Sequence, residues 1–244
     1  MISPAPTSVP QPLGRRLLAE FLGTGLLVAI VVGSGIAAAD LSPDDVGLQL
    51  LENSMATVFG LAVLILMLGP VSGAHFNPVV TVADWFLSRR DPEGFSAAHI
   101  GPYVVAQCVG AIAGGLLANA MFGVGTSFSE HERASGGHLL GEVVATAGLV
   151  LLIFALVRSD RVALAAPAVG AYIGAAYWFT SSTSFANPAV SLGRMFSDTF
   201  AGIAPSSVPA FVVAQIVGAA IGVALVLALY PFPSPHAHQG EPHA

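Results

Sequence analysis

The chain has 244 residues, of which 55% are hydrophobic and only 9% are charged, and its mean hydropathy is +0.78. Soluble domains carry roughly 25% charged residues, so this composition excludes an ordinary soluble protein and indicates one whose main partner is the lipid bilayer. The net charge is −6, no nucleic-acid partner is expected, and the single cysteine excludes an internal disulfide.

Six long apolar runs are predicted to cross the membrane as helices. They cover residues 17–39, 53–68, 97–122, 139–157, 162–180 and 208–230. The first run is too long for the core of a signal peptide, so we expect it to be retained. Nothing alternates with a period of two, and an open strand edge cannot face lipid, so strands are excluded. The tails, 1–14 and 231–244, are predicted to be disordered.

Two shorter apolar segments each begin with Asn-Pro. They are Asn77-Pro78-Val79 and Asn187-Pro188-Ala189. Asparagine is a favoured N-cap and proline is favoured at the first helical position, so each motif predicts the start of a helix. Each helix has room for about three turns, far fewer residues than a membrane span needs. Such a pair in matching halves indicates a solute site built from two half-helices.

The two halves of the chain also repeat elsewhere. Residues 19–24 and 104–111 match residues 141–146 and 212–219, in the same order around the Asn-Pro motifs. Three full spans in each half require the second half to be inverted. The predicted fold is therefore an all-α membrane protein with six transmembrane helices and two re-entrant half-helices in an inverted 3+3 repeat. The repeats are predicted at 15–122 and 139–230, joined by an extracellular loop at 123–138.

The charges predict the orientation. All eight basic residues are arginines, and six of them would lie on one side of the membrane: Arg15, Arg16, Arg89, Arg90, Arg158 and Arg161. The opposite loops are acidic, with Arg133 as their only cation. By the positive-inside rule the arginine-rich side is cytoplasmic, so we expect both termini inside and the protein in the inner (plasma) membrane.

Small residues four apart predict close helix crossings in three spans. The pairs are Gly110/Gly114, Gly170/Gly174 and Gly218/Gly222.

The block Ala19–Thr24, the segment Ser72–Pro78 and the motif Asn187–Ala189 together resemble the aquaporin (major intrinsic protein) family. The resemblance covers nearly the whole chain, from about residue 17 to 229, and is greatest to a bacterial branch associated with arsenic resistance. It implies a homotetramer with one pore per subunit. No cofactor and no metal site are expected.

The two Asn-Pro motifs would form the centre of the pore. Aligned peptide dipoles place partial positive charge at each half-helix N-terminus, and two such ends meeting at mid-membrane repel cations and protons but not neutral solutes. The carbonyl oxygens of Asn77 and Asn187 would cap the backbone while their amides donate to a passing oxygen.

Two carboxylates, Glu20 and Glu142, fall at matching places inside spans. An intramembrane carboxylate is costly and is by default functional. We expect the pair to support the irregular backbone before each half-helix, as the resemblance also implies, with a proton relay as the alternative.

The predicted selectivity filter departs from the family. Where its usual motif reads Asn-Pro-Ala-Arg, this chain has Val190, and Arg194 one turn later is expected to reach a carbonyl or the cytoplasmic interface. Counting back from Asn77 and Asn187 without gaps gives two further filter positions, Thr57 and Ala175, for which Phe59 or Tyr177 are the alternatives. The loop before Asn187 supplies Ser184. The predicted filter residues are Thr57, Ala175, Ser184 and Val190.

A wide, uncharged filter predicts a passive channel for small neutral solutes such as glycerol, urea, arsenous acid or methylated arsenicals, and water as well. The alternative is an ion-coupled carrier, since carriers also use inverted repeats and broken helices. An intramembrane enzyme using Ser34 is disfavoured because no histidine lies deep in a span. His75 is expected to be a hydrogen-bonded loop residue rather than a gate, Cys108 inert packing, and the histidines of the C-terminal tail incidental: His236, His238 and His243.

Overall fold

The structure is a computed structural model that describes residues 11–231. The described chain is helical and has no strand. Its elements are α1 (Leu13–Leu41), α2 (Val46–Ser72), α3 (Pro78–Ser88), α4 (Ala97–Phe122), α5 (Gly136–Arg158), the 3₁₀ turn η1 (Val162–Leu164), α6 (Ala165–Phe179), α7 (Pro188–Arg194) and α8 (Val208–Leu229). Six of these segments are long and apolar enough to span a membrane, α6 being counted together with η1. The predicted fold class is confirmed. The predicted disorder is wrong for Leu13 and Gly14, which belong to α1, and most of both predicted tails lies outside the described residues.

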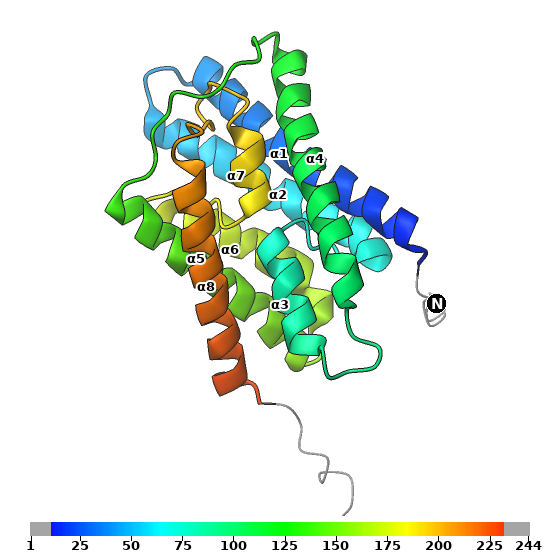
Figure 1. The fold of residues 1–244 in the computed structure, drawn as a ribbon. Coiled ribbons are helices and arrows are strands. Elements are labelled where there is room, and N and C mark those ends of the chain that lie inside the picture. Colours follow the sequence, from blue (N-terminus) through cyan, green and yellow to red (C-terminus); the bar gives the residue numbers. More distant parts are fainter. Residues whose placement is uncertain (1–10, 232–244) are drawn as a thin grey trace, which may run out of the picture.

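The two halves pack in the same way. In the first half α1 packs along α4, in the second half α5 packs along α8, and α2 contacts α6 between the halves. The short helices α3 and α7 contact each other and both contact α4 and α8. In Figure 1, α7 occupies the upper part of the bundle and α3 the lower part, and they approach each other near its middle. This is the inverted arrangement that the repeat predicted.

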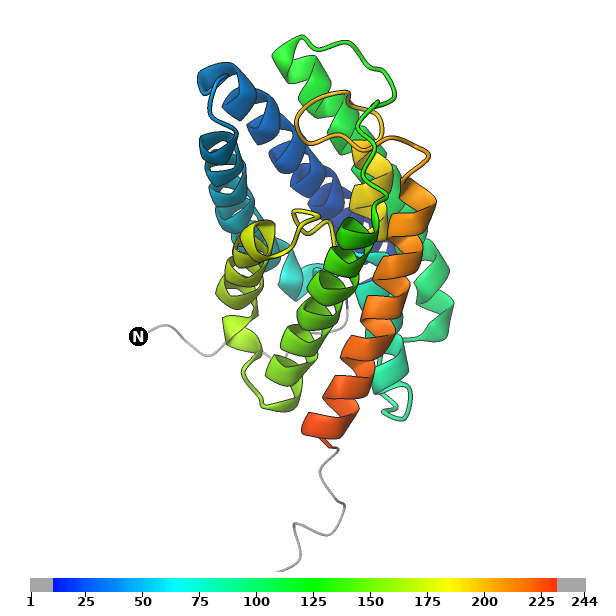
Figure 2. The same cartoon turned by 90° about the vertical axis from the view of Figure 1, so that its left-hand side faces the viewer.

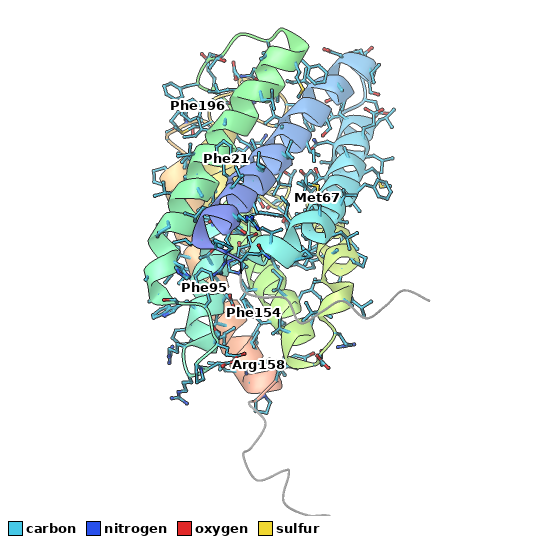
Figure 3. The ribbon with its side chains drawn as sticks, turned by 90° about the vertical axis from the view of Figure 1, so that its right-hand side faces the viewer. Phe21, Met67, Phe95, Phe154, Arg158 and Phe196 are labelled. Atoms are coloured by element: carbon cyan, nitrogen blue, oxygen red, sulfur yellow. The ribbon has the colours of Figure 1, made fainter. Side chains whose placement is uncertain are left out.

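The loops at the two ends of the helix bundle differ in charge. Figure 2 shows the α3–α4 and α5–α6 connections at one end of the bundle and the α1–α2 and α4–α5 connections at the other. The first end carries Arg89, Arg90 and Arg158, and Figure 3 places the labelled Arg158 there, far from Phe196. The opposite end carries acidic residues such as Asp44. The chain is a multi-pass membrane protein, and its orientation remains a prediction from this asymmetry.

Glycines permit the close contacts between paired helices. A Cβ added to Gly114 on α4 would lie 2.0 Å from the carbonyl oxygen of Gly25 on α1. On the matching pair of helices, a Cβ on Gly218 would lie 2.5 Å from the carbonyl oxygen of Val143. Both distances are shorter than any real contact, so the helix backbones approach as closely as the small-residue spacing predicted.

The boundaries of α2 differ most from the sequence prediction. Helix α2 begins at Val46 instead of residue 53, because the Asp45 side chain caps it by accepting a hydrogen bond from Leu48 N at 2.9 Å. The same helix continues through Pro70 to Ser72. Hydropathy locates the lipid-embedded part of a helix, whereas local capping determines where the helix ends.

Candidate functional site

Both half-helices begin at their Asn-Pro motifs. Asn77 Oδ1 accepts a hydrogen bond from Val79 N at 3.1 Å, and Asn187 Oδ1 accepts one from Ala189 N at 3.0 Å. Pro78 and Pro188 occupy the first helical positions, where the missing N–H has no intrahelical partner to lose. The amide oxygens therefore cap the helices, as the motif predicts.

The amide nitrogens join the two halves. Asn77 Nδ2 donates to Ala186 O at 2.8 Å, and Asn187 Nδ2 donates to Phe76 O at 2.7 Å. Each amide nitrogen carries two N–H groups, and no second acceptor is found for either within residues 11–231. One N–H of each asparagine thus fixes the junction of the half-helices, and the other can serve a solute.

The loops before the half-helices have strained backbone. Phe76 and Ala186, the residues just before the two asparagines, have φ angles of 49° and 48°, in the left-handed region that residues with a Cβ rarely adopt. Such a conformation persists only where its surroundings determine it. Here the determining groups are buried carboxylates, described next.

Glu20 and Glu142 hold these loops by their backbone N–H groups. Glu20 accepts hydrogen bonds from His75 N at 3.0 Å and Phe76 N at 2.7 Å. Glu142 accepts the equivalent bonds from Phe185 N at 2.9 Å and Ala186 N at 2.8 Å. Both carboxylates are fully buried, and these contacts correspond to the supporting role expected from the sequence.

A glutamine completes each loop support. Gln107 Nε2 donates to Glu20 at 2.8 Å and to Thr81 Oγ1 at 2.9 Å. In the other half, Gln215 Nε2 donates to Glu142 at 2.6 Å, and to Ser191 Oγ at 2.9 Å. The two glutamines lie in repeated blocks of the sequence, but no role was predicted for them. The available signal was an amide repeated at the same place in two apolar spans.

A single cavity of about 280 Å³ passes both asparagines. Its wall includes His75 and Asp84 near one end and Arg194 near the other, with Asn77 and Asn187 between them. Most of the remaining wall is aliphatic, contributed by α1, α2, α5 and α6. The half-helices therefore meet at a lumen that is apolar except for a few polar groups.

Of the predicted filter residues, Thr57, Ser184 and Val190 line this cavity and Ala175 does not. Ala175 is exposed on the outer face of α6, whereas Tyr177, two residues later, is buried and lines the lumen. Residues two apart on a helix point about 200° apart, so the ungapped count placed this position on the wrong face. The alternative Phe59 is 62% exposed and also faces outward.

Two hydroxyls in the lumen differ in their partners. The Tyr177 hydroxyl lies 3.1 Å from Thr57 Oγ1, which itself donates to Asn53 O at 2.9 Å. Tyr177 must therefore donate to Thr57, which leaves the tyrosine oxygen able to accept a hydrogen bond. Ser184 lines the cavity, but its Oγ is buried and has no hydrogen-bond partner in the described chain.

Arg194 reaches a carbonyl, one of its two predicted positions. Its Nε donates to Ala201 O at 2.5 Å, and its guanidinium lies 3.5 Å from the centroid of the Phe185 ring. It is at the end of α7 opposite the Asn-Pro motif, toward the α7–α8 connection rather than the arginine-rich loops (Figure 1). Of the two alternatives, the structure shows the carbonyl contact, and Arg194 lies toward the end of the bundle opposite the one predicted to be cytoplasmic. Sequence reasoning assigned no role to Phe185.

His75 is a hydrogen-bonded residue near the other end of the cavity. Its Nδ1 lies 3.2 Å from Thr81 Oγ1, and its Nε2 lies 3.2 Å from Asp84 Oδ2. Asp84 was not singled out from the sequence. No cluster of potential metal ligands occurs among the described residues, and the histidines of the C-terminal tail lie outside them.

Ser34, the residue considered for the disfavoured enzyme alternative, has hydrogen-bond partners in the helices. Its Oγ donates to Ile30 O at 2.6 Å and accepts from Asn53 Nδ2.

Comparisons with known proteins agree with this geometry. A family model described as major intrinsic protein matches residues 8–196. The chain is 50% identical to the aquaglyceroporin AqpS of Rhizobium meliloti (strain 1021), with 88% of this chain and 89% of that protein covered. It is 30% identical to the probable aquaporin AqpM of Archaeoglobus fulgidus, with 85% and 93% covered. The solved aquaglyceroporin of Plasmodium falciparum shares the fold, with a TM-score of 0.63 at 21% identity and 88% and 96% coverage.

Proposed function

The chain belongs to the major intrinsic protein family of channels, and from that membership we propose that it conducts small neutral solutes passively through the cavity between its half-helices. The observation that carries the proposal is the single lumen that passes both Asn77 and Asn187. The proposed solutes are glycerol, urea and neutral metalloid acids such as arsenous acid, with methylated arsenicals and water also passing.

The polar groups of the lumen suit uncharged, oxygen-bearing solutes. The free N–H groups of Asn77 and Asn187 can donate to a solute oxygen, and the Tyr177 oxygen can accept a hydrogen bond from a solute hydroxyl. A neutral hydroxyl compound can exchange its water hydrogen bonds for these, whereas an ion loses far more hydration than this wall replaces.

Ion and proton exclusion follows from the two half-helix N-termini in the proposed mechanism. The backbone dipoles of α3 and α7 place partial positive charge at the centre of the lumen. The cross-bonds between Asn77 and Asn187 and the opposite loops keep these ends together. A cation or a hydrated proton is repelled there, while a neutral solute is not.

The proposal that solutes larger than water pass through the lumen rests on Val190. It lines the lumen where the family resemblance expects an arginine, so the lumen is wider and uncharged at that position. The 50% identical relative is named an aquaglyceroporin, which supports glycerol as a solute. We also propose a homotetramer in the plasma membrane with both termini in the cytoplasm.

The proposal is tested with purified protein in liposomes. Stopped-flow light scattering measures swelling after exposure to gradients of glycerol, urea or arsenous acid, with protein-free liposomes as the control. The proposal predicts faster swelling with at least one of these solutes in the absence of any ion gradient. Swelling at the protein-free rate with all of them would refute it.

A further inference from the structure

A charged side chain lines the lumen beyond the predicted constriction. Arg194 is the last residue of α7, is only 3% exposed and contributes to the cavity wall. It follows Val190 by four residues, so the two side chains lie on the same face of α7 about one helical turn apart. We propose that Arg194 supplies the positive charge of the selectivity filter, one turn farther from the Asn-Pro junction than Val190. This inference rests on the proposed channel function.

The guanidinium of Arg194 is held in a fixed position. Its Nε donates to Ala201 O at 2.5 Å, and its Cζ lies over the Phe185 ring, 3.5 Å from the ring centroid. The ring is itself anchored, because Phe185 N donates to the buried Glu142. No acceptor is found within residues 11–231 for the Nη groups of Arg194, so their N–H donors are available to a solute in the lumen.

The charge of Arg194 is not neutralised by an ion pair. Both ion pairs found in the described part of the chain involve histidines elsewhere. The Glu142 carboxylate accepts its hydrogen bonds from Phe185 N, Ala186 N and Gln215 Nε2, and no ion pair joins it to Arg194 in the described residues. Arg133 adds a second positive charge near the same ring, at 5.4 Å, but is not part of the cavity wall.

This arrangement explains how a lumen with valine at position 190 can still select neutral solutes over cations. A fixed, unpaired positive charge beside a largely apolar lumen repels cations strongly, because the lumen screens the charge less than bulk water does. The Nη groups of Arg194 donate hydrogen bonds and the Tyr177 oxygen accepts them. The filter therefore favours small neutral solutes that carry both hydroxyl hydrogens and oxygen lone pairs, and it leaves more room beside Val190 than an arginine there would.

The first test removes the charge. Arg194→Gln is compared with the parent and with Arg161→Gln, which removes an exposed arginine from the α5–α6 turn. Glycerol flux is measured by light scattering, and potassium leak by the decay of an imposed potassium gradient. We expect Arg194→Gln to increase the ratio of potassium leak to glycerol flux by about tenfold or more, because a unit charge beside the ion path has been removed. Arg161→Gln should match the parent in both.

A second variant leaves Arg194 and its contacts in place, in case Arg194→Gln fails to fold. Val190→Glu puts a carboxylate one turn before Arg194, in the spacing that favours an ion pair, and Val190→Gln is its uncharged control of similar size. Val190→Glu should increase the potassium leak, and Val190→Gln should not.

The outcomes separate this inference from the channel function. A parent protein that carries no glycerol would refute the channel function, whatever the leak. A parent that carries glycerol, with potassium exclusion unchanged in Arg194→Gln or Val190→Glu, would show that Arg194 only anchors the loop, and would overturn the inference.

Discussion

Asn77 and Asn187 each donate a hydrogen bond to the carbonyl group that precedes the other asparagine. The same two side chains cap their own half-helices through their amide oxygens. Each asparagine therefore fixes the start of one half-helix and the end of the loop that leads to the other. Because of this reciprocal contact, residues of both repeats together form the centre of the lumen.

Replacing Asn187 with aspartate should separate these two roles. Aspartate still caps α7 but cannot donate to Phe76 O, and it brings negative charge to the lumen. We expect a stability loss of about 1–3 kcal/mol from the unpaired buried carbonyl, together with a new cation leak. The control is Asn119→Asp, which loses a comparable donor to Phe196 O away from the lumen. A leak in both variants, or in neither, would contradict the role given to Asn187.

Glu142→Gln should destabilise the loop before α7. The carboxylate accepts hydrogen bonds from Phe185 N, Ala186 N and Gln215 Nε2, and an amide can accept only on its single oxygen. At least one buried donor then loses its partner, at a cost of about 1–3 kcal/mol. Thermal unfolding in detergent should show a lower Tm than for Glu130→Gln, a surface substitution. An unchanged Tm with unchanged glycerol flux would show that the loop does not depend on Glu142.

Gly114→Ala should weaken the contact between α1 and α4. The new methyl group would lie 2.0 Å from Gly25 O, so the two helices must move apart along their crossing. Overpacking of this kind costs about 1–3 kcal/mol. The matched control is Gly101→Ala on the same helix, where no heavy atom lies within 4 Å of the added Cβ. Equal Tm values for the two variants would mean that this crossing tolerates separation.

Val190→Arg should narrow the lumen where the family resemblance expects an arginine. We expect glycerol flux to fall by about tenfold or more, which corresponds to a barrier increase of about 1.4 kcal/mol, and water flux to fall less. Val190→Ala, which does not narrow the lumen, should retain the glycerol flux. Undiminished glycerol flux in Val190→Arg would show that position 190 does not form part of the constriction.

Much of the fold could be predicted because the bilayer restricts it. Apolar runs of sufficient length must become helices, and the repeated blocks around Asn77 and Asn187 imply the inverted arrangement. The two carboxylates were also identifiable, since Glu20 and Glu142 are acidic residues at matching places in apolar spans. Each of these signals is local in sequence or comes from internal comparison.

The filter could not be predicted to the same depth because it depends on helix rotation and loop path. Ala175 and Tyr177 are two residues apart, and only the packing of α6 decides which faces the lumen. The position of Arg194 depends on Ala201 and Phe185, which approach it through the connections on either side of α7. No sequence spacing encodes these contacts.

The proposal that solutes pass without ion coupling is tested most directly by glycerol uptake into liposomes with and without a proton gradient. Collapsing the gradient with a protonophore should leave the rate of uptake unchanged, because a passive channel responds only to the gradient of its solute. A rate that rises with an imposed proton gradient and falls when it is collapsed would instead identify an ion-coupled carrier.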